Sequence, residues 1–176
     1  MTRALFVLLL AGCTVADEPY PARWDPLPAA ASADCRHFHG TYADRGEAPG
    51  NPNRPSLTRE IFGPDSPWER AVSIELAPGD ETLDIHVEAP GAKEFSRHLT
   101  TKARDFSCDQ GKLVVRSRRW VTSDVMSGRE TVKIELHQAE QHLVARVDET
   151  TTGVMFMVVP LSGESARWYR FQRLKP

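Results

Sequence analysis

Near the start of the chain, Cys35, His37 and His39 are of the residue types that bind metals. They alternate along the sequence, so on a β-strand they would share one face. Thiolate and imidazole groups are common zinc ligands, but structural zinc sites take four protein ligands and this cluster offers three. We therefore expect neither a metal nor any other cofactor.

The sequence lacks the spacing of a known catalytic centre. It has no Gly-rich phosphate loop, no His-Glu-x-x-His and no Gly-x-Ser-x-Gly. The positions expected to face inward are nearly all aliphatic, namely Val72, Ile74, Leu76, Leu83, Ile85, Val87, Val132, Ile134 and Leu136. A catalytic centre needs titratable groups in a pocket, so we expect a protein that is not an enzyme.

One row of residues has the composition of a binding surface. Arg116, Arg118 and Trp120 alternate, so a strand would place them on one face, with Arg119 on the other. Two guanidinium groups and a large flat ring are enriched at binding hot spots. The alternative is a surface strand whose arginines pair with acidic strands elsewhere in the sheet.

Charge is unevenly distributed along the chain. Residues 14–90 contain 6 Lys+Arg and 14 Asp+Glu, a difference of −8, whereas residues 91–176 contain 15 and 10, a difference of +5. The basic half could contact an anionic glycolipid or an acidic envelope protein, unless the acidic strands neutralise it. The net charge of −2 over 176 residues does not indicate binding to nucleic acid.

The N-terminus has the order of a secretory signal: Arg3, then a short apolar core at residues 4–10, then small residues. The segment Leu10-Ala11-Gly12-Cys13 resembles the lipobox of bacterial lipoproteins. This resemblance implies that residues 1–12 are a signal peptide and that Cys13 is acylated and held at a membrane. The alternative is a buried N-terminal helix with an incidental cysteine.

The same resemblance bears on location and on the remaining cysteines. Thr14 stands where many members of the family carry the aspartate that retains them at the inner membrane. The periplasmic face of the outer membrane is therefore implied. With Cys13 acylated, Cys35 and Cys108 remain as an even pair in an oxidising compartment, which favours a disulfide over a metal site.

Residues 13–33 comprise the lipidated cysteine and a Pro/Ala-rich segment, followed by a single domain over residues 34–176. Proline-rich chains are extended, so we expect a tether that holds the domain off the membrane. The alternative is a segment that packs over the domain through Trp24 or Leu27.

From Cys35 onward, apolar residues recur with a period of two and short connections follow one another. Eight or nine strands predict an all-β fold, either an antiparallel up-and-down barrel or a sandwich. Thr152-Gly153 and Ser162-Gly163 are expected turns that flank a strand over Val154–Val159. Pro55–Gly63 predicts one short helix, lying as a lid over a barrel mouth or a sheet edge.

Two further resemblances are short. Gly40-Thr41-Tyr42 resembles the Gly-x-Trp opening of lipocalins, with tyrosine in place of tryptophan, and implies a barrel that can hold an apolar ligand. The segment from Phe106 to Gly111, together with Ser162-Gly163, resembles the membrane-bound lysozyme inhibitors. The chain as a whole is similar to the small lipoproteins of Gram-negative bacteria.

These observations predict a non-catalytic lipoprotein that binds an envelope protein or an anionic glycolipid. One alternative is a periplasmic inhibitor of a cell-wall hydrolase, with Leu161–Ala166 as a protruding polar loop. The other is a carrier of an apolar ligand, with a dry cavity under the helix.

Overall fold

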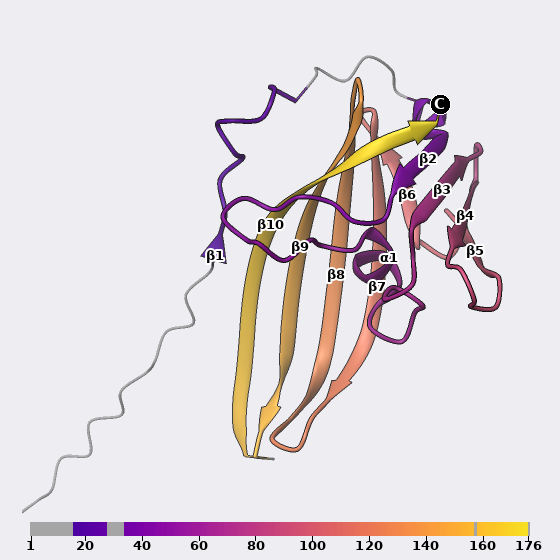
Figure 1. Ribbon diagram of the computed structural model, residues 1–176. Helices are drawn as coiled ribbons and strands as arrows, with labels where there is room; N and C mark the ends of the chain where they lie inside the picture. Colours follow the sequence, from indigo (N-terminus) through magenta and orange to yellow (C-terminus); the bar gives the residue numbers. More distant parts are fainter. Residues whose placement is uncertain (1–15, 28–33, 157, 176) are drawn as a thin grey trace, which may run out of the picture.

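Nine antiparallel strands form a nearly closed barrel in the computed structural model, which describes residues 16–27, 34–156 and 158–175 (Figure 1). The strands are β2 (Gly40–Ala43), β3 (Ser73–Pro78), β4 (Thr82–Glu88), β5 (Phe95–Thr100), β6 (Phe106–Asp109), β7 (Lys112–Thr122), β8 (Met126–Ala139), β9 (His142–Met155) and β10 (Val159–Lys175). Their order around the barrel is β5-β4-β3-β2-β10-β9-β8-β7-β6. The outermost strands β5 and β6 do not pair, so the barrel keeps an open seam between them.

The barrel has a short half and a long half. Strands β2 to β5 have 4 to 7 residues, whereas β7 to β10 have 11 to 17 and run well past the short strands (Figure 1). The core lies where the two halves face each other. Its fully buried side chains include Phe38, Tyr42, Leu76, Ile85, Leu136 and Phe171. The all-β barrel is therefore confirmed, with an extended sheet projecting from one end.

The predicted short helix is confirmed as α1 (Leu57–Phe62). The Ser56 side chain caps it by accepting a backbone N–H of the first turn, and Gly63 ends it at φ 87°. Leu57 and Ile61 are buried, which holds the helix against β7 and β8 at the mouth of the barrel.

The N-terminal segment, residues 16–27, packs on the outside of the barrel. Its β1 (Ala16–Asp17) pairs in parallel with β10. The Trp168 indole N–H donates to the Glu18 carbonyl oxygen at 3.1 Å, and Trp24 packs beside Trp168 in a small apolar cluster on the outer face. Residues 16–27 therefore pack over the domain through Trp24, because the aromatic side chains gain more by burial than by solvation.

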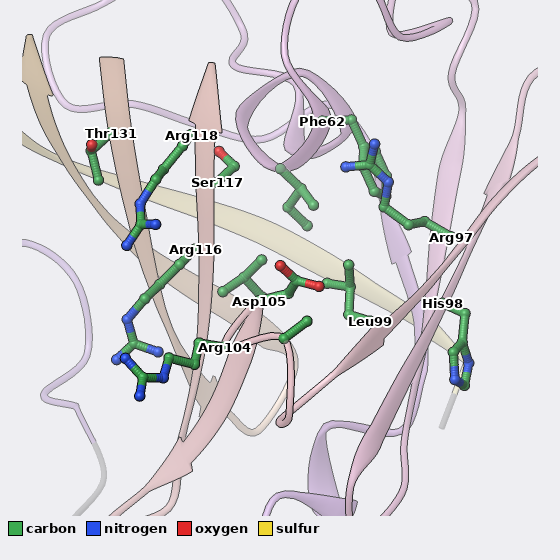
Figure 2. Close-up of a pocket in the computed structure, with 13 residues that line it drawn as sticks. Phe62, Arg97, His98, Leu99, Arg104, Asp105, Arg116, Ser117, Arg118 and Thr131 are labelled. Atoms are coloured by element: carbon green, nitrogen blue, oxygen red, sulfur yellow. The ribbon is translucent and has the colours of Figure 1, made fainter. Parts of the chain in front are cut away.

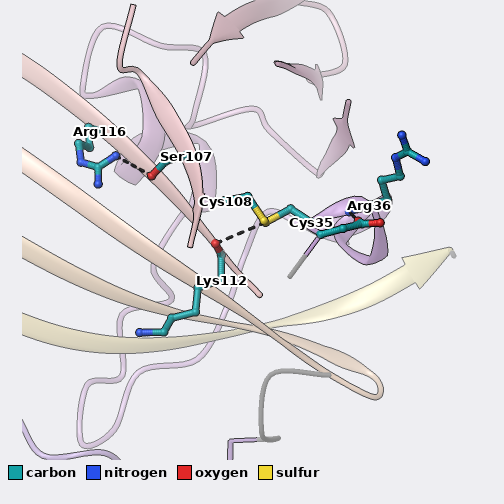
Figure 3. The surroundings of a disulfide bond; sticks show 7 residues. Cys35, Arg36, Ser107, Cys108, Lys112 and Arg116 are labelled. Atoms are coloured by element: carbon teal, nitrogen blue, oxygen red, sulfur yellow. Dashed lines mark hydrogen bonds between the residues drawn. A yellow bond between two sulfur atoms is a disulfide. The ribbon is translucent and has the colours of Figure 1, made fainter. Parts of the chain in front are cut away.

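A disulfide joins Cys35 to Cys108, with 5.8 Å between the two Cα atoms (Figure 3). Cys35 lies in the segment that precedes β2, and Cys108 lies in β6. These two strands are not neighbours in the barrel. The expected common strand face of Cys35, His37 and His39 is wrong, because Arg36–Phe38 form a 3-10 helix, η1. The disulfide thus joins two parts of the barrel that no strand pairing connects directly.

Two expected turns are continuous strand. Thr152-Gly153 lies within β9 and Ser162-Gly163 within β10, and Val154–Val159 holds the turn between these strands. A Cβ atom on Gly153, which faces Gly128 of β8, would lie 2.5 Å from a carbonyl oxygen of β8. Glycine is needed here for the close approach of two strands, not for a turn.

Three other expectations need correction. Leu161–Ala166 forms no protruding loop, because it pairs with β9 without interruption. Val72 is 49% exposed because it precedes the start of β3, although the other eight positions expected inside are buried. The strand β6 was not expected, since its four residues are too few to show an alternation.

Candidate functional site

Arg116, Arg118 and Trp120 are all exposed and lie in a row along one face of β7, as the alternation predicts. Trp120 is the most open of the exposed aromatic side chains described, at 68%. Arg119 faces the inside of the barrel, where it pairs with the buried Glu130. The predicted row is thus available to a partner, whereas its inward neighbour is not.

A cavity of about 520 Å³ opens at the seam, between β5 and β7 (Figure 2). The pairing of β6 with β7 stops at Val115, and the Arg116 backbone N–H donates to the Asp105 carbonyl oxygen at 2.7 Å; beyond Arg116, that edge of β7 has no paired strand. Ile61 and Phe62 of α1, Leu99 of β5 and Val115 supply an apolar wall. A cavity of this size can hold a small-molecule head group.

Four arginines line this cavity: Arg97, Arg104, Arg116 and Arg118. We call them the arginine seam. Figure 2 shows Arg104, Arg116 and Arg118 pointing to one side of β7, with Arg97 beside Phe62 across the cavity. The Arg116 guanidinium donates to the Ser107 hydroxyl at 2.9 Å (Figure 3).

The arginine seam brings four positive charges to a cavity that one carboxylate, Asp105, lines. None of its four members forms an ion pair with a carboxylate of residues 16–27, 34–156 or 158–175. Asp105 is the carboxylate that lines the cavity, and His98 is engaged with Asp84. The interpretation that acidic strands neutralise Arg116 and Arg118 is therefore not supported by the ion pairs found.

Helix α1 also borders a second cavity of about 540 Å³, over the inner face of β7 to β10. We call it the lid cavity. Its charged lining includes Glu60, Arg119, Glu130, Glu149 and Arg167. Arg119 pairs with Glu130 and Arg167 with Glu149, so most of these charges are compensated in place.

Glu130 and Glu149 share a hydrogen bond inside the lid cavity. This hydrogen bond, with burial, raises the pKa of Glu149 to about 7. Burial acts to raise the pKa of Glu130 as well, but hydrogen bonds with Glu149 and Arg119 outweigh it and lower that pKa. Near neutral pH the two carboxyl groups therefore hold one proton between them.

The expectation of an almost wholly aliphatic interior is wrong at this end of the barrel. Glu130 lies on the same strand face as Val132 and Ile134, and Glu149 on the same face as Val147. The sequence signal for these inward-facing carboxylates was a charged residue at the same alternating positions as a series of buried apolar residues. It marks an inward-facing charge that needs a partner.

The two cavities suit different chemistry. The arginine seam can bind an anion, because its guanidinium groups have no described carboxylate partner. In the lid cavity, Arg119 and Arg167 already pair with Glu130 and Glu149. Within the described part of the chain, no three metal-binding side chains gather at one place, and no helix is long and apolar enough to cross a membrane.

In comparisons with known proteins, no family model, no curated protein and no solved structure matches this chain.

Proposed function

We propose that this protein is a lipoprotein on the periplasmic face of the outer membrane, anchored through acylated Cys13, which binds a phosphate-bearing glycolipid without catalysing a reaction. The observation that carries the binding role is the arginine seam. Four arginines with no described carboxylate partner line a cavity of about 520 Å³ that has an apolar wall. The lipobox resemblance of Leu10-Ala11-Gly12-Cys13 supports the anchor.

The chemistry of the seam matches a phosphorylated amphiphile. Arg116 and Arg118 are two residues apart on one strand face, which separates them by about 7 Å. Guanidinium groups bind phosphate oxygens through two parallel hydrogen bonds. The wall formed by Ile61, Leu99 and Val115 offers apolar contact to the chain that follows a phosphorylated head group. Free phosphate would use the arginines alone.

The other two functions gain no specific observation. The inhibitor hypothesis relied on a protruding loop over Leu161–Ala166, which is paired strand. The apolar carrier relied on a dry cavity under the helix, and the lid cavity there is lined by charged groups, among them Glu149 and Arg167.

The anchor is tested by fractionating cells that express the Cys13→Ser precursor. We expect release from the membrane fraction on washing, or an uncleaved precursor, because the sulfur of Cys13 is the proposed point of attachment. Retention of mature Cys13→Ser protein in the outer-membrane fraction at wild-type levels would contradict the anchor.

Binding is tested with the acyl-free mature chain, which starts at residue 13 and carries Cys13→Ser. It should bind lipopolysaccharide vesicles, and Arg116→Ala with Arg118→Ala should weaken binding at least about tenfold, since each lost charge-assisted contact is worth about 1.5 kcal/mol or more. Arg23→Ala with Arg70→Ala removes the same charge from exposed sites away from the seam and should have little effect.

Two further probes identify the source of the phosphate. Phosphatidylglycerol vesicles offer an anionic lipid without a sugar, and inorganic pyrophosphate offers phosphate without a lipid. Preference for lipopolysaccharide over both supports the proposal. Equal binding of all three probes, or binding that the seam variant retains in full, would contradict it.

A further inference from the structure

The free end of the long sheet carries an exposed apolar surface. Of the large hydrophobic side chains exposed in the described part of the chain, five lie in the two turns at this end or at the adjoining ends of β9 and β10: Val125, Val154, Phe156, Val158 and Val159, with exposures of 40 to 78%. We call these five residues the apolar tip. Thr150–Gly163, which contains four of them, has no charged residue. A soluble protein rarely exposes such a run unless the surface has a partner.

The two turns are held side by side. The Phe156 backbone N–H donates to the Val125 carbonyl oxygen at 2.8 Å, which joins the β9–β10 turn to the β7–β8 turn. Phe156 also has a φ of 51°, a conformation that favours glycine or asparagine and is costly for an aromatic residue. The turn therefore keeps a bulky apolar side chain, 62% exposed, at a position where a small polar one would be more stable.

The direction of β1 places the start of the mature chain on the same side. Because β1 runs parallel to β10, with Ala16 opposite Ser165, the chain enters β1 from the end that bears the apolar tip. Cys13 precedes Ala16 by three residues, which span at most about 10 Å. Ser165 is six residues along β10 from Val159, about 20 Å of strand. The tip thus extends about 20 Å past β1 on the side from which the chain arrives, which exceeds the length that three residues can span.

Side chains suited to a bilayer surface follow the tip in order. Trp120 and Arg129 line a shallow hollow together with Val154 of the tip. Tryptophan and arginine at this level fit the boundary between acyl chains and head groups. Arg118 and Arg116 precede Trp120 on β7 by two and four residues, so they lie farther from the tip. This gradient matches a leaflet with acyl chains below and anionic head groups above.

We propose that the apolar tip inserts into the leaflet that holds the acyl anchor, as a second membrane contact that sets the orientation of the barrel. An insertion of about 10 Å is the depth at which interfacial segments bury their apolar face. The orientation rests on the proposed anchor at Cys13, whereas the contact itself does not. In this orientation the arginine seam opens near the head groups, where the proposed glycolipid lies.

The test is the partition of the acyl-free mature chain into neutral phosphatidylcholine vesicles, measured by sedimentation. We expect binding, and at least about a tenfold loss in Phe156→Asn with Val158→Ser, because two large apolar groups leave the leaflet. Asparagine accepts the positive φ at residue 156, so the turn should be retained. Val72→Ser, a matched change at a valine that is 49% exposed elsewhere, should leave partition unchanged.

Partition of the tip variant equal to that of the parent would overturn the proposal. Failure of the parent to bind neutral vesicles would also overturn it, and self-association through the tip would then point to a protein contact. Circular dichroism and thermal melting verify that each variant is folded. Arg116→Ala with Arg118→Ala should keep partition into neutral vesicles, and the tip variant should keep binding to detergent-dispersed lipopolysaccharide. Each proposal can therefore fail without the other.

Discussion

Arg118 and Arg119 are adjacent in sequence but serve opposite faces of β7. Arg118 is exposed at the seam and pairs with no described carboxylate, whereas Arg119 pairs with Glu130, whose side chain is 8% exposed. The alternation of the strand thus assigns one arginine to solvent and a potential ligand, and its neighbour to the interior. The two residues allow binding and folding to be separated by nearly identical substitutions.

Arg118→Ala should change the free energy of unfolding by less than about 0.5 kcal/mol, as is usual at an exposed position. Arg119→Ala should cost about 3 kcal/mol, because it leaves a buried carboxylate without its partner. Urea denaturation measures both values. If the two variants were equally stable, the division of roles along β7 would be wrong.

The contribution of Glu149 to stability should fall as pH rises from 5 to 8. Its pKa of about 7 in the folded protein exceeds the ordinary value of 4.5, so the folded state holds a proton that the unfolded state has lost. The stabilisation from this bound proton is complete below pH 4.5 and is lost as pH rises through about 7. The free energy of unfolding should decrease by up to about 3 kcal/mol over this range.

Glu149→Gln should flatten this pH dependence, since glutamine is neutral throughout and can still donate to Glu130. Thermal melts at a series of pH values measure the slope. Glu164→Gln, at an exposed position on β10, is the matched control and should retain the parental slope. An unchanged slope in Glu149→Gln would mean that another group titrates.

The disulfide should contribute strongly to stability. Cys35 and Cys108 are 73 residues apart in sequence, so their bond closes a long loop and restricts the unfolded chain. Replacing both with alanine should lower the free energy of unfolding by about 4 kcal/mol. Mass spectrometry of the exported protein without reductant should find the two linked. Free thiols at both positions would contradict this bond in the cell.

Trp24 should hold the N-terminal segment on the barrel. It is 6% exposed and packs beside Trp168, with Arg170 placed 5.1 Å from its ring. Trp24→Ala should raise the rate of tryptic cleavage after the exposed Arg23 about fivefold or more, because local opening exposes this bond. Trp120→Ala removes an exposed tryptophan and should leave the rate unchanged. Equal cleavage rates in the two variants would show that Trp24 does not hold the N-terminal segment on the barrel.

Local patterns predicted much of this fold because strand alternation is a local property. The period of two identified the buried faces of β3, β4 and β8, and the Arg116, Arg118 and Trp120 row on β7. Proline and glycine around the Leu57–Phe62 segment likewise predicted α1. These features depend on neighbours within a few residues.

Pairing between distant strands was not predictable in the same way. The role of Gly153 depends on Gly128 of another strand, so its sequence suggested a turn that does not exist. The lid cavity depends on the meeting of Glu130 and Glu149, and the seam cavity on the absence of pairing between β5 and β6. Each requires the register and closure of the barrel, which no single segment encodes.

The most direct test of the proposed binding role is backbone hydrogen exchange of the acyl-free mature chain with and without detergent-dispersed lipopolysaccharide. Detergent-dispersed ligand reports on the seam without a bilayer. The proposal predicts slowed exchange at residues 97–105 and 115–118, which flank the seam cavity, with residues around the lid cavity unchanged. Protection confined to the lid cavity, or no protection at the seam under saturating ligand, would contradict glycolipid binding by the arginine seam.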